Sequence, residues 1–200
     1  DILHYIQDGA ADIGIAGENI ILEEQLAGGN PLRKKNEVKI QKRLGFGKCR
    51  LSIAVEKTFA YQNLQSLSGL RLATSYPGIL QNYLEKNGVE AEIREVSGSV
   101  EVAPSTGLAD AVCDLVSTGS TLAAHGLREV EIILQSEALL VAGTNLGSEL
   151  SQILDSLTFR MEAVLEARKV KYVLLNAPNS KLDSILSLLP SSRSPTVVPL

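Results

Sequence analysis

The stretch "DAVCDLVSTGSTLAAHGL", residues 110–127, indicates how the chain is folded. Its apolar run ending at residues 114–116 has the character of a buried strand, and residues 122–124 favour a helix. Between them stand five small residues, Ser117, Thr118, Gly119, Ser120 and Thr121. A strand that passes through a small polar loop into a helix is the repeating unit of α/β proteins, so the stretch predicts that architecture.

The composition is that of a globular chain without a general attraction for polyanions. The chain has 200 residues, enough for one large or two small domains, of which 44% are hydrophobic and 21% charged. Its net charge of −4 gives no overall pull toward nucleic acid or an anionic membrane. No apolar run approaches a membrane span and no leader peptide is apparent, so we expect a cytoplasmic protein with no nucleic-acid and no membrane partner.

Strand and helix patterns alternate along the whole chain, which favours mainly parallel sheets. Basic residues 33–35 are interpreted as a solvated loop rather than a phosphate clamp. The pattern predicts strands at residues 12–17, 38–44, 49–55, 69–74, 92–96, 114–116, 131–134, 138–142, 171–176 and 196–200. It predicts helices at residues 2–9, 20–26, 79–87, 107–113, 122–124, 147–168 and 181–189.

The small-residue loop has the best physical case for binding a ligand. Gly119 and Ser120 let an anion approach the backbone, and the first amides of a helix starting at Thr121 lack partners within that helix. Such a loop can hold a monophosphate without a lysine, because aligned N–H groups supply the attraction. The alternative is an ordinary strand-to-helix turn with a hydroxyl cap, and the five residues alone do not separate the two interpretations.

Acidic residues lie near this loop in the sequence. Asp110 and Asp114 precede it, four residues apart, and Glu101 ends an earlier segment. Carboxylates beside a phosphate site are useful if they hold sugar hydroxyls or a magnesium ion shared with the phosphates. Alternatively, Asp110 is a solvated helix residue and Asp114 belongs to a helix-to-strand turn.

The remaining reactive side chains favour no metal or nucleophile site. His4 and His125, the only histidines, have no Ser, Cys or metal-ligand partner at a useful spacing, and we expect them at helix surfaces or caps. Cys49 and Cys113 lie in separate apolar runs and are expected to be buried free thiols. We therefore predict no metal-ligand cluster among the protein side chains.

Five motifs taken in order resemble one enzyme family. They are "DGAADIGIAGENI" (8–20), "LGFGKCRLSIAV" (44–55), "ATSYP" (73–77), "GSVEVAP" (98–104) and "GLADAVCDLVSTGSTL" (107–122). Together they are similar to ATP phosphoribosyltransferase, the first enzyme of histidine biosynthesis. The segment 171–200 resembles the start of the C-terminal regulatory domain of the long form of that enzyme. The resemblance implies a fragment that lacks the family's N-terminal segment, with its basic phosphate-contacting turn, and the end of the regulatory domain.

The resemblance implies a two-lobed, type II periplasmic-binding-protein-like catalytic region in the α/β class. Lobe I would comprise residues 1–48 and 127–168, and lobe II, which binds phosphoribosyl pyrophosphate, residues 49–126. Residues 169–200 would begin a ferredoxin-like α+β regulatory domain. Family likeness further implies Mg2+, feedback inhibition by histidine, and homo-oligomers from dimer to hexamer.

The reaction implied is the condensation of N1 of the adenine of ATP with C1 of phosphoribosyl pyrophosphate, with loss of pyrophosphate. By position in the motifs, Ser117, Thr118, Gly119, Ser120 and Thr121 would hold the 5-phosphate, although some relatives carry arginine in place of Ser120. Asp114 and Asp110 would hold the ribose hydroxyls, and Glu101 would lie near the sugar or its magnesium. The residues implied toward the nucleotide are Asp12, Gly14, Gly17, Glu18, Thr74, Ser75 and Tyr76.

A second hypothesis belongs to another class of protein. The same two-lobed scaffold is used by solute-binding and sensor proteins that bind a small anion without chemistry. The acidic residues beside the phosphate loop and the absence of a leader peptide favour the transferase.

Overall fold

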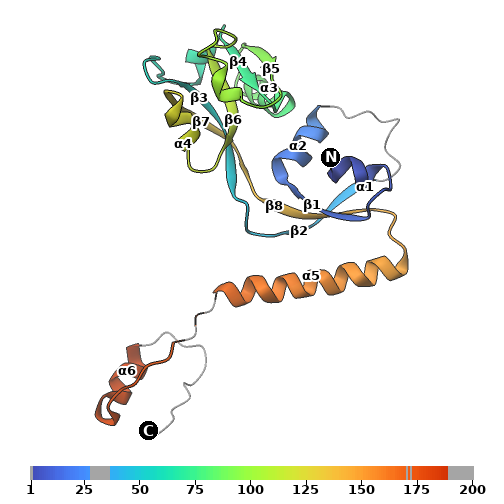
Figure 1. Cartoon of the computed structure of the whole chain (residues 1–200), viewed down its shortest axis with the longest axis vertical. Coiled ribbons are helices and arrows are strands. Elements are labelled where there is room, and N and C mark those ends of the chain that lie inside the picture. The colour runs from blue at the N-terminus through green and yellow to red at the C-terminus, as the bar shows by residue number, and fades with distance from the viewer. Residues whose placement is uncertain (1, 28–36, 170, 172, 189–200) are drawn as a thin grey trace. The chain divides into compact units, whose positions relative to one another are not determined.

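Two β-sheets, joined by strands that continue from one into the other, form the main body of the protein (Figure 1). The computed structural model describes residues 2–27, 37–169, 171 and 173–188. Residues 1–165 form one unit and residues 166–200 a second. None of the described helices is long and apolar enough to cross a membrane.

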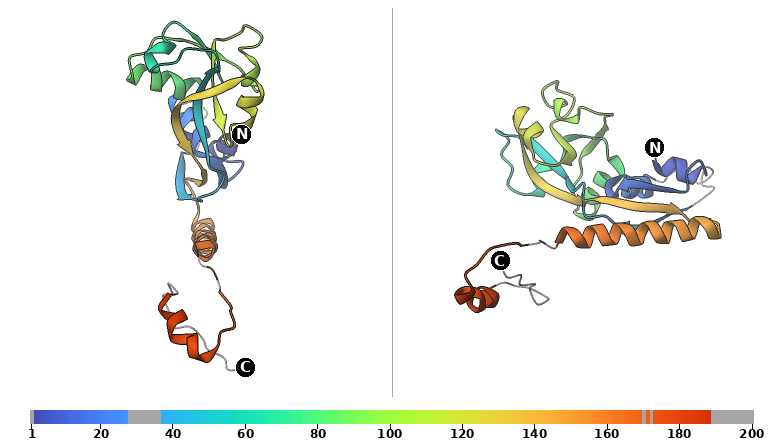
Figure 2. Two further views of the ribbon diagram at one scale, coloured as in Figure 1. Left: turned by 90° about the vertical axis from the view of Figure 1, so that its left-hand side faces the viewer. Right: turned by 60° about the horizontal axis from the view of Figure 1, so that its bottom comes forward.

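The smaller sheet has three antiparallel strands in the order β1-β8-β2. They are β1 (Ile13–Gly17), β8 (Ala138–Gly143) and β2 (Val38–Arg43). Alternation along β8 sends Leu139 and Val141 to one face, where they pack with Leu3, Ile6 and Ile21 of α1 (Ile2–Gln7) and α2 (Glu18–Leu26). Leu140 and Ala142 point to the other face, where they pack with Leu154 of α5 (Ser148–Lys169). Figure 2 shows α5 running alongside the smaller sheet.

The larger sheet has five strands in the order β5-β4-β6-β3-β7. They are β5 (Glu92–Glu95), β4 (Arg71–Thr74), β6 (Ala111–Val116), β3 (Cys49–Glu56) and β7 (Leu127–Ser136). One face packs against α3 (Pro77–Lys86) and η2 (Leu64–Leu67). The other face packs against η3 (Val100–Val102) and α4 (Ser120–Ala124), chiefly through Val100 and Leu122.

The prediction of mainly parallel sheets was wrong. Among the described residues, the only parallel pairs are β4 with β5 and β4 with β6, whereas β3 runs antiparallel to both β6 and β7. β3 and β7 each connect to a strand of the smaller sheet through residues 44–48 and 137, and no helix intervenes. The chain enters the larger sheet through β2 and β3 and returns through β7 and β8, so these strands run in opposite directions and pair antiparallel in both sheets.

The helix predicted at residues 107–113 was also wrong. Residues 107–110 are irregular, and residues 111–113 belong to β6. Cys113 is fully buried between β3 and β4, where Val112 packs on the opposite face. Tertiary burial of the run "AVCDLV" therefore decides its structure, although the residues before it permit a helix.

The lobe boundaries predicted from the motifs place residues 127–136 with the smaller sheet. β7 occupies these residues and is hydrogen-bonded along its length to β3 of the larger sheet. We propose that the second lobe extends to Ser136 and that the polypeptide crosses between the lobes at residues 44–48 and 137.

The described residues of the unit at 166–200 contain one of the elements predicted there. α6 (Leu182–Leu188) follows the short η4 (Asn179–Lys181), close to the predicted helix at 181–189. The described residues of the strand predicted at 171–176 are irregular, and no neighbouring strand among the described residues supplies the hydrogen bonds that a strand needs. The strand predicted at 196–200 and the basic stretch 33–35 lie outside the described residues.

Candidate functional site

The parallel strands β4, β5 and β6 place three loops at one edge of the larger sheet. Their carboxyl ends lead into residues 75–76, 96–99 and 117–119. In open α/β sheets, ligands bind beyond the carboxyl ends of the strands. β3 runs the other way, so its first residues, including Arg50, reach the same edge.

The loop at residues 117–121 is open to solvent. Ser117, Thr118, Ser120 and Thr121 are exposed, and Gly119 is half-buried. Gly119 has φ 82° and ψ 2°, a left-handed conformation that glycine adopts without strain, and it precedes the first residue of α4. The hydroxyls of Thr118 and Ser120 lie 2.9 Å apart. The turn is therefore accessible rather than sealed beneath other protein atoms.

Several main-chain amides of this loop have no protein partner. Among the described residues, the N–H groups of Gly119, Thr121 and Leu122 donate to no acceptor, and that of Ser120 makes only a long contact of 3.4 Å to Thr118 Oγ1. α4 has five residues, so exposed amides rather than a long helix dipole would supply the attraction for an anion. This geometry supports the phosphate-binding interpretation of the loop.

Two carboxylates, Asp114 and Glu101, approach each other beside this loop. Asp114 lies two residues before the end of β6, on the face covered by η3, which carries Glu101. Partial burial raises the pKa of Asp114, the Glu101 carboxylate raises it further, and a hydrogen bond of 2.7 Å from the amide of Leu115 opposes both. A half-buried carboxylate beside a second one, without an ion pair to any cationic side chain in the described part of the chain, is typical of a binding or catalytic site.

Asp110 does not join this group. It stands before the first residue of β6, so the strand of six residues, roughly 20 Å, separates it from the loop. There it receives hydrogen bonds from the amide of Arg71 at 2.9 Å and from Arg71 Nη2 at 2.7 Å. The Arg71 side chain lowers the pKa of Asp110 to about 2. Asp110 is thus paired with Arg71 away from the loop, and the role at the ribose that the motif implied for it stays a prediction.

The motif resemblance implies seven residues that line the nucleotide site. Four of them are engaged within the protein or lie away from this region. Asp12 comes just before β1 and Gly17 is the last residue of β1, so the two lie at opposite ends of this strand. A side chain at Gly14 would collide with Ile2, so this glycine permits close packing of α1. Thr74 is fully buried and accepts the amide of Tyr76 at 2.9 Å, and the Ser75 hydroxyl donates to the carbonyl of Val96 at 2.6 Å.

The other three lie where α2 meets the larger sheet. Glu18 begins α2 and is paired with Arg43, which also contacts Glu137 at 3.0 Å. Gly17 precedes Glu18, and the Tyr76 hydroxyl accepts a hydrogen bond of 3.0 Å from Asn19 Nδ2. Burial raises the pKa of the Tyr76 phenol, with a smaller contribution from Asp114, so Tyr76 links this region to the carboxylate pair.

Sequence reasoning missed three residues of this region. Asn19 is buried and exchanges hydrogen bonds with Ser136 at 3.1 and 2.8 Å. Glu23 accepts the amides of Gly78 and Ile79 at 2.7 and 2.9 Å, and so caps α3 from α2. Only the topology brings these segments together, so no local pattern in the sequence signals their roles.

The third missed residue is Arg50, a cation next to the loop. Its Nη1 donates to the carbonyl of Ser117 at 3.1 Å, and its Nε donates to the Glu129 carboxylate at 2.8 Å. It lies opposite Val116 at the edge where β6 ends. The prediction of a loop without a basic residue of its own holds, but a neighbouring strand supplies one.

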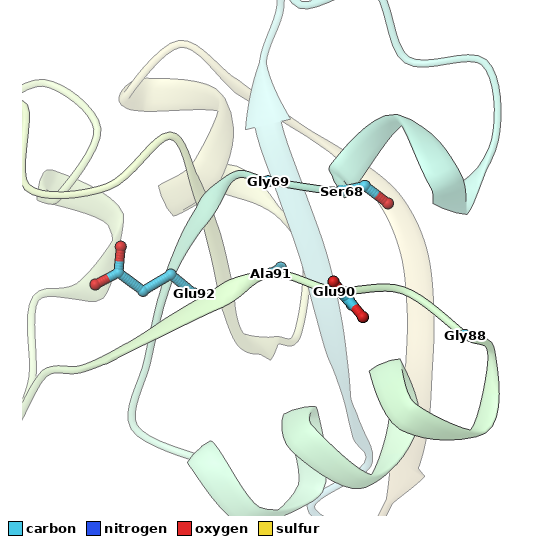
Figure 3. Close-up of a pocket in the computed structure, with 6 residues that line it drawn as sticks. All are labelled: Ser68, Gly69, Gly88, Glu90, Ala91 and Glu92. Atoms are coloured by element: carbon cyan, nitrogen blue, oxygen red, sulfur yellow. The ribbon is translucent and has the colours of Figure 1, made fainter.

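The remaining candidates lie outside this site. A surface hollow lined by Ser68, Gly69, Gly88, Glu90, Ala91 and Glu92 lies at the amino ends of β4 and β5, the opposite edge of the sheet (Figure 3). Its two glutamates make it a poor site for an anion. His4 and His125 are exposed on α1 and at the end of α4, as predicted. Both cysteines are free thiols, Cys113 buried and Cys49 half-buried.

The described residues contain no group of three His, Cys, Asp or Glu side chains that could hold a metal ion. Mg2+ usually binds through one or two carboxylates together with substrate phosphates. Asp114 and Glu101 fit that arrangement, in which the ion arrives with the substrate.

Models of two families match the chain. That of the ATP phosphoribosyltransferase HisG matches residues 1–163, and that of the HisG C-terminal domain matches residues 167–200. Among solved structures, the ATP phosphoribosyl transferase (HisG:HisZ) complex of Thermotoga maritima is 25% identical with a TM-score of 0.67, over 84% of this chain and 76% of that chain. The aliphatic sulphonate binding protein SsuA of Escherichia coli, 15% identical with a TM-score of 0.58 over 84% of this chain and 60% of its own, shows the shared fold alone.

Curated relatives match the chain over its full length. The ATP phosphoribosyltransferases of Cytophaga hutchinsonii and Parabacteroides distasonis are 50% and 52% identical over all 200 residues. The chain spans 66% and 67% of the length of these two relatives. By the family model over residues 1–163 and by this identity, the chain belongs to the ATP phosphoribosyltransferase family, a family of pentosyltransferases.

Proposed function

We propose that the full-length protein condenses ATP with phosphoribosyl pyrophosphate, giving phosphoribosyl-ATP and pyrophosphate, the first step of histidine biosynthesis. The observation that carries the proposal is the exposed loop at 117–121 beside the Asp114–Glu101 pair, in which the amides of Gly119 and Thr121 donate to no acceptor among the described residues. The loop and the two carboxylates occur in a chain that is 50% and 52% identical in sequence to two ATP phosphoribosyltransferases.

The loop would hold the 5-phosphate of phosphoribosyl pyrophosphate. The amides of Gly119, Thr121 and Leu122 supply donors that no protein atom among the described residues uses. The hydroxyls of Ser117, Thr118, Ser120 and Thr121 are exposed and add donors of their own. Arg50 holds the carbonyl of Ser117, and so fixes the start of the loop.

The two carboxylates would act on the sugar. Asp114 would hold a ribose hydroxyl, and Glu101 would lie near the sugar or its magnesium. Both carboxylates would stabilise the positive charge that develops on the ribose as its bond to pyrophosphate breaks. Asp114 and Glu101 would hold a magnesium ion that arrives with the substrate, and the ion would supply charge neutralisation of the pyrophosphate leaving group. The protein then needs only to hold N1 of adenine behind C1, and no residue is assigned as a covalent nucleophile.

The ATP side of the site is proposed at the junction of α2 and α3. Tyr76 would face the nucleotide together with Gly17 and Glu18. Residues 167–200 match the C-terminal domain of the family, to which we assign feedback inhibition by histidine. We expect homo-oligomers from dimer to hexamer, acting in the cytoplasm.

The test is release of pyrophosphate by the full-length protein in the presence of ATP, phosphoribosyl pyrophosphate and magnesium. Release that requires both substrates supports the proposal. Binding of phosphoribosyl pyrophosphate with no release of pyrophosphate would contradict it and would favour a solute-binding or sensor protein.

A further inference from the structure

One buried hydroxyl next to the carboxylate pair has no hydrogen-bond partner. Ser52, in the middle of β3, is 1% exposed, and its Oγ contacts no donor or acceptor among the described residues. A buried hydroxyl without a partner costs the folded state about 1–3 kcal/mol. Alanine would fit the same position in the sheet without this cost. Packing of the core therefore does not explain why a hydroxyl is present.

The register of the sheet places Ser52 directly opposite Asp114. The two residues are paired across the antiparallel strands β3 and β6. Side chains at paired positions point to the same face of the sheet, with their Cβ atoms about 4.5–5.5 Å apart. Ala54 and Val112, two residues from Ser52 and Asp114 respectively, pack in one cluster with Val100 and Leu122, so η3 and α4 cover this face of the sheet.

The charges around Asp114 leave room for a donor. Glu101 on η3 repels it, and Tyr76 at the start of α3 is close enough to be affected by its charge. Arg50 is two residues from Ser52 on β3, but it is engaged by Glu129 on β7 and by the carbonyl of Ser117. Among the described residues, the only donor to the Asp114 carboxylate is the amide of Leu115, to Oδ1. No donor among the described residues reaches the second oxygen of this carboxylate, Oδ2.

We propose that Ser52 is a positioning residue for Asp114. The Ser52 hydroxyl donates its hydrogen to the Asp114 carboxylate from the side of the sheet while that carboxylate holds the ribose. The role rests on the proposed function of Asp114. Ser52 itself is too deeply buried to touch a substrate. It acts by fixing the rotamer of Asp114 and by favouring its charged form beside Glu101.

The experiment compares full-length wild type with Ser52→Ala, and uses Ser136→Ala as the matched control. Ser136 is the other buried serine with a sheet position, and its hydroxyl is fully engaged by Asn19. We expect Ser136→Ala to lower Tm by a few degrees and Ser52→Ala to leave Tm unchanged or raise it. Despite its stability, Ser52→Ala should lose about tenfold in kcat, the loss that corresponds to one hydrogen bond of ordinary net strength, with KM for ATP unchanged.

The decisive readout is the titration of Asp114. The carboxyl carbon of Asp114, assigned by its loss in Asp114→Asn, is followed by NMR against pH, with ribose 5-phosphate as the probe ligand and without it. Removal of a donor to the charged form raises the pKa, so the titration in Ser52→Ala should move to higher pH in the bound protein, together with the acidic limb of kcat. An unchanged pKa in both the free and the bound protein overturns the role of Ser52. A wild type that releases no pyrophosphate refutes the proposed function instead, and the titration still decides whether Ser52 acts on Asp114.

Discussion

Replacement of Gly119 by alanine tests whether binding of the phosphate depends on the backbone geometry of the loop rather than on the stability of the fold. Gly119 has φ 82°, where an alanine costs roughly 1–2 kcal/mol. A Cβ placed there would meet only Val116 Cγ1, at 3.8 Å, which is ordinary contact. The substitution therefore strains the turn but creates no collision with the core.

The strain is relieved if φ turns negative, and this rotation redirects the amides that we assign to the 5-phosphate. A hydrogen bond to a charged group contributes about 1.5–3 kcal/mol, so loss of one amide should weaken binding of phosphoribosyl pyrophosphate by roughly 10- to 150-fold. Gly126→Ala is the matched control, since Gly126 has φ 73°, has open space around its Cβ position, and follows the other end of α4.

The assay is isothermal titration of phosphoribosyl pyrophosphate into both full-length variants, together with their thermal unfolding. Both variants should lose similar stability, a fall in Tm of several degrees. Only Gly119→Ala should lose affinity. Equal affinities of the two variants would refute the assignment of the loop amides to the phosphate.

Four further outcomes follow from the same geometry. Asp114→Asn should reduce turnover at least a hundredfold while Tm stays level or rises, because it removes a half-buried charge; unfolding with full residual activity would make the residue structural. Asp110→Asn should show the reverse, a lower Tm with near-normal turnover, in the same two assays. Since Arg71 holds the pKa of Asp110 near 2, this pair stabilises the wild type above about pH 4 and is lost as pH falls toward about 2, so acid unfolding of Asp110→Asn should lack that step. Glu23→Gln should loosen the contact between α2 and α3 and raise hydrogen exchange at the first amides of α3; unchanged exchange would contradict the capping role.

The sequence predicted most of the elements because their patterns are local. The apolar run at 49–55, the glycine turn after β1 and the long amphipathic pattern at 147–168 each specify one element, and β3, β1 and α5 lie close to those positions. The strand direction was not predicted. It depends on how β3 and β7 continue into the other sheet, which no window of a dozen residues contains.

The candidate site was predicted in part for the same reason. The loop at 117–121 and Asp114 share one segment, so a single motif identifies both. Asp110 belongs to that motif too, but six residues of extended strand carry it to the other end of the sheet, where it pairs with Arg71. Arg50 and Ser52 reach the site across strand pairs, and register is a property of the folded sheet that sequence spacing alone does not give.

We propose that main-chain amides at the start of α4 bind the terminal phosphate of the sugar. Amide NMR of the full-length protein observes these groups themselves. Addition of ribose 5-phosphate should shift the N–H resonances of Gly119, Thr121 and Leu122 downfield and slow their exchange with solvent, with little change at Gly126. If those three resonances stay in place while ribose 5-phosphate binds, the phosphate lies elsewhere and these amides do not form its binding site.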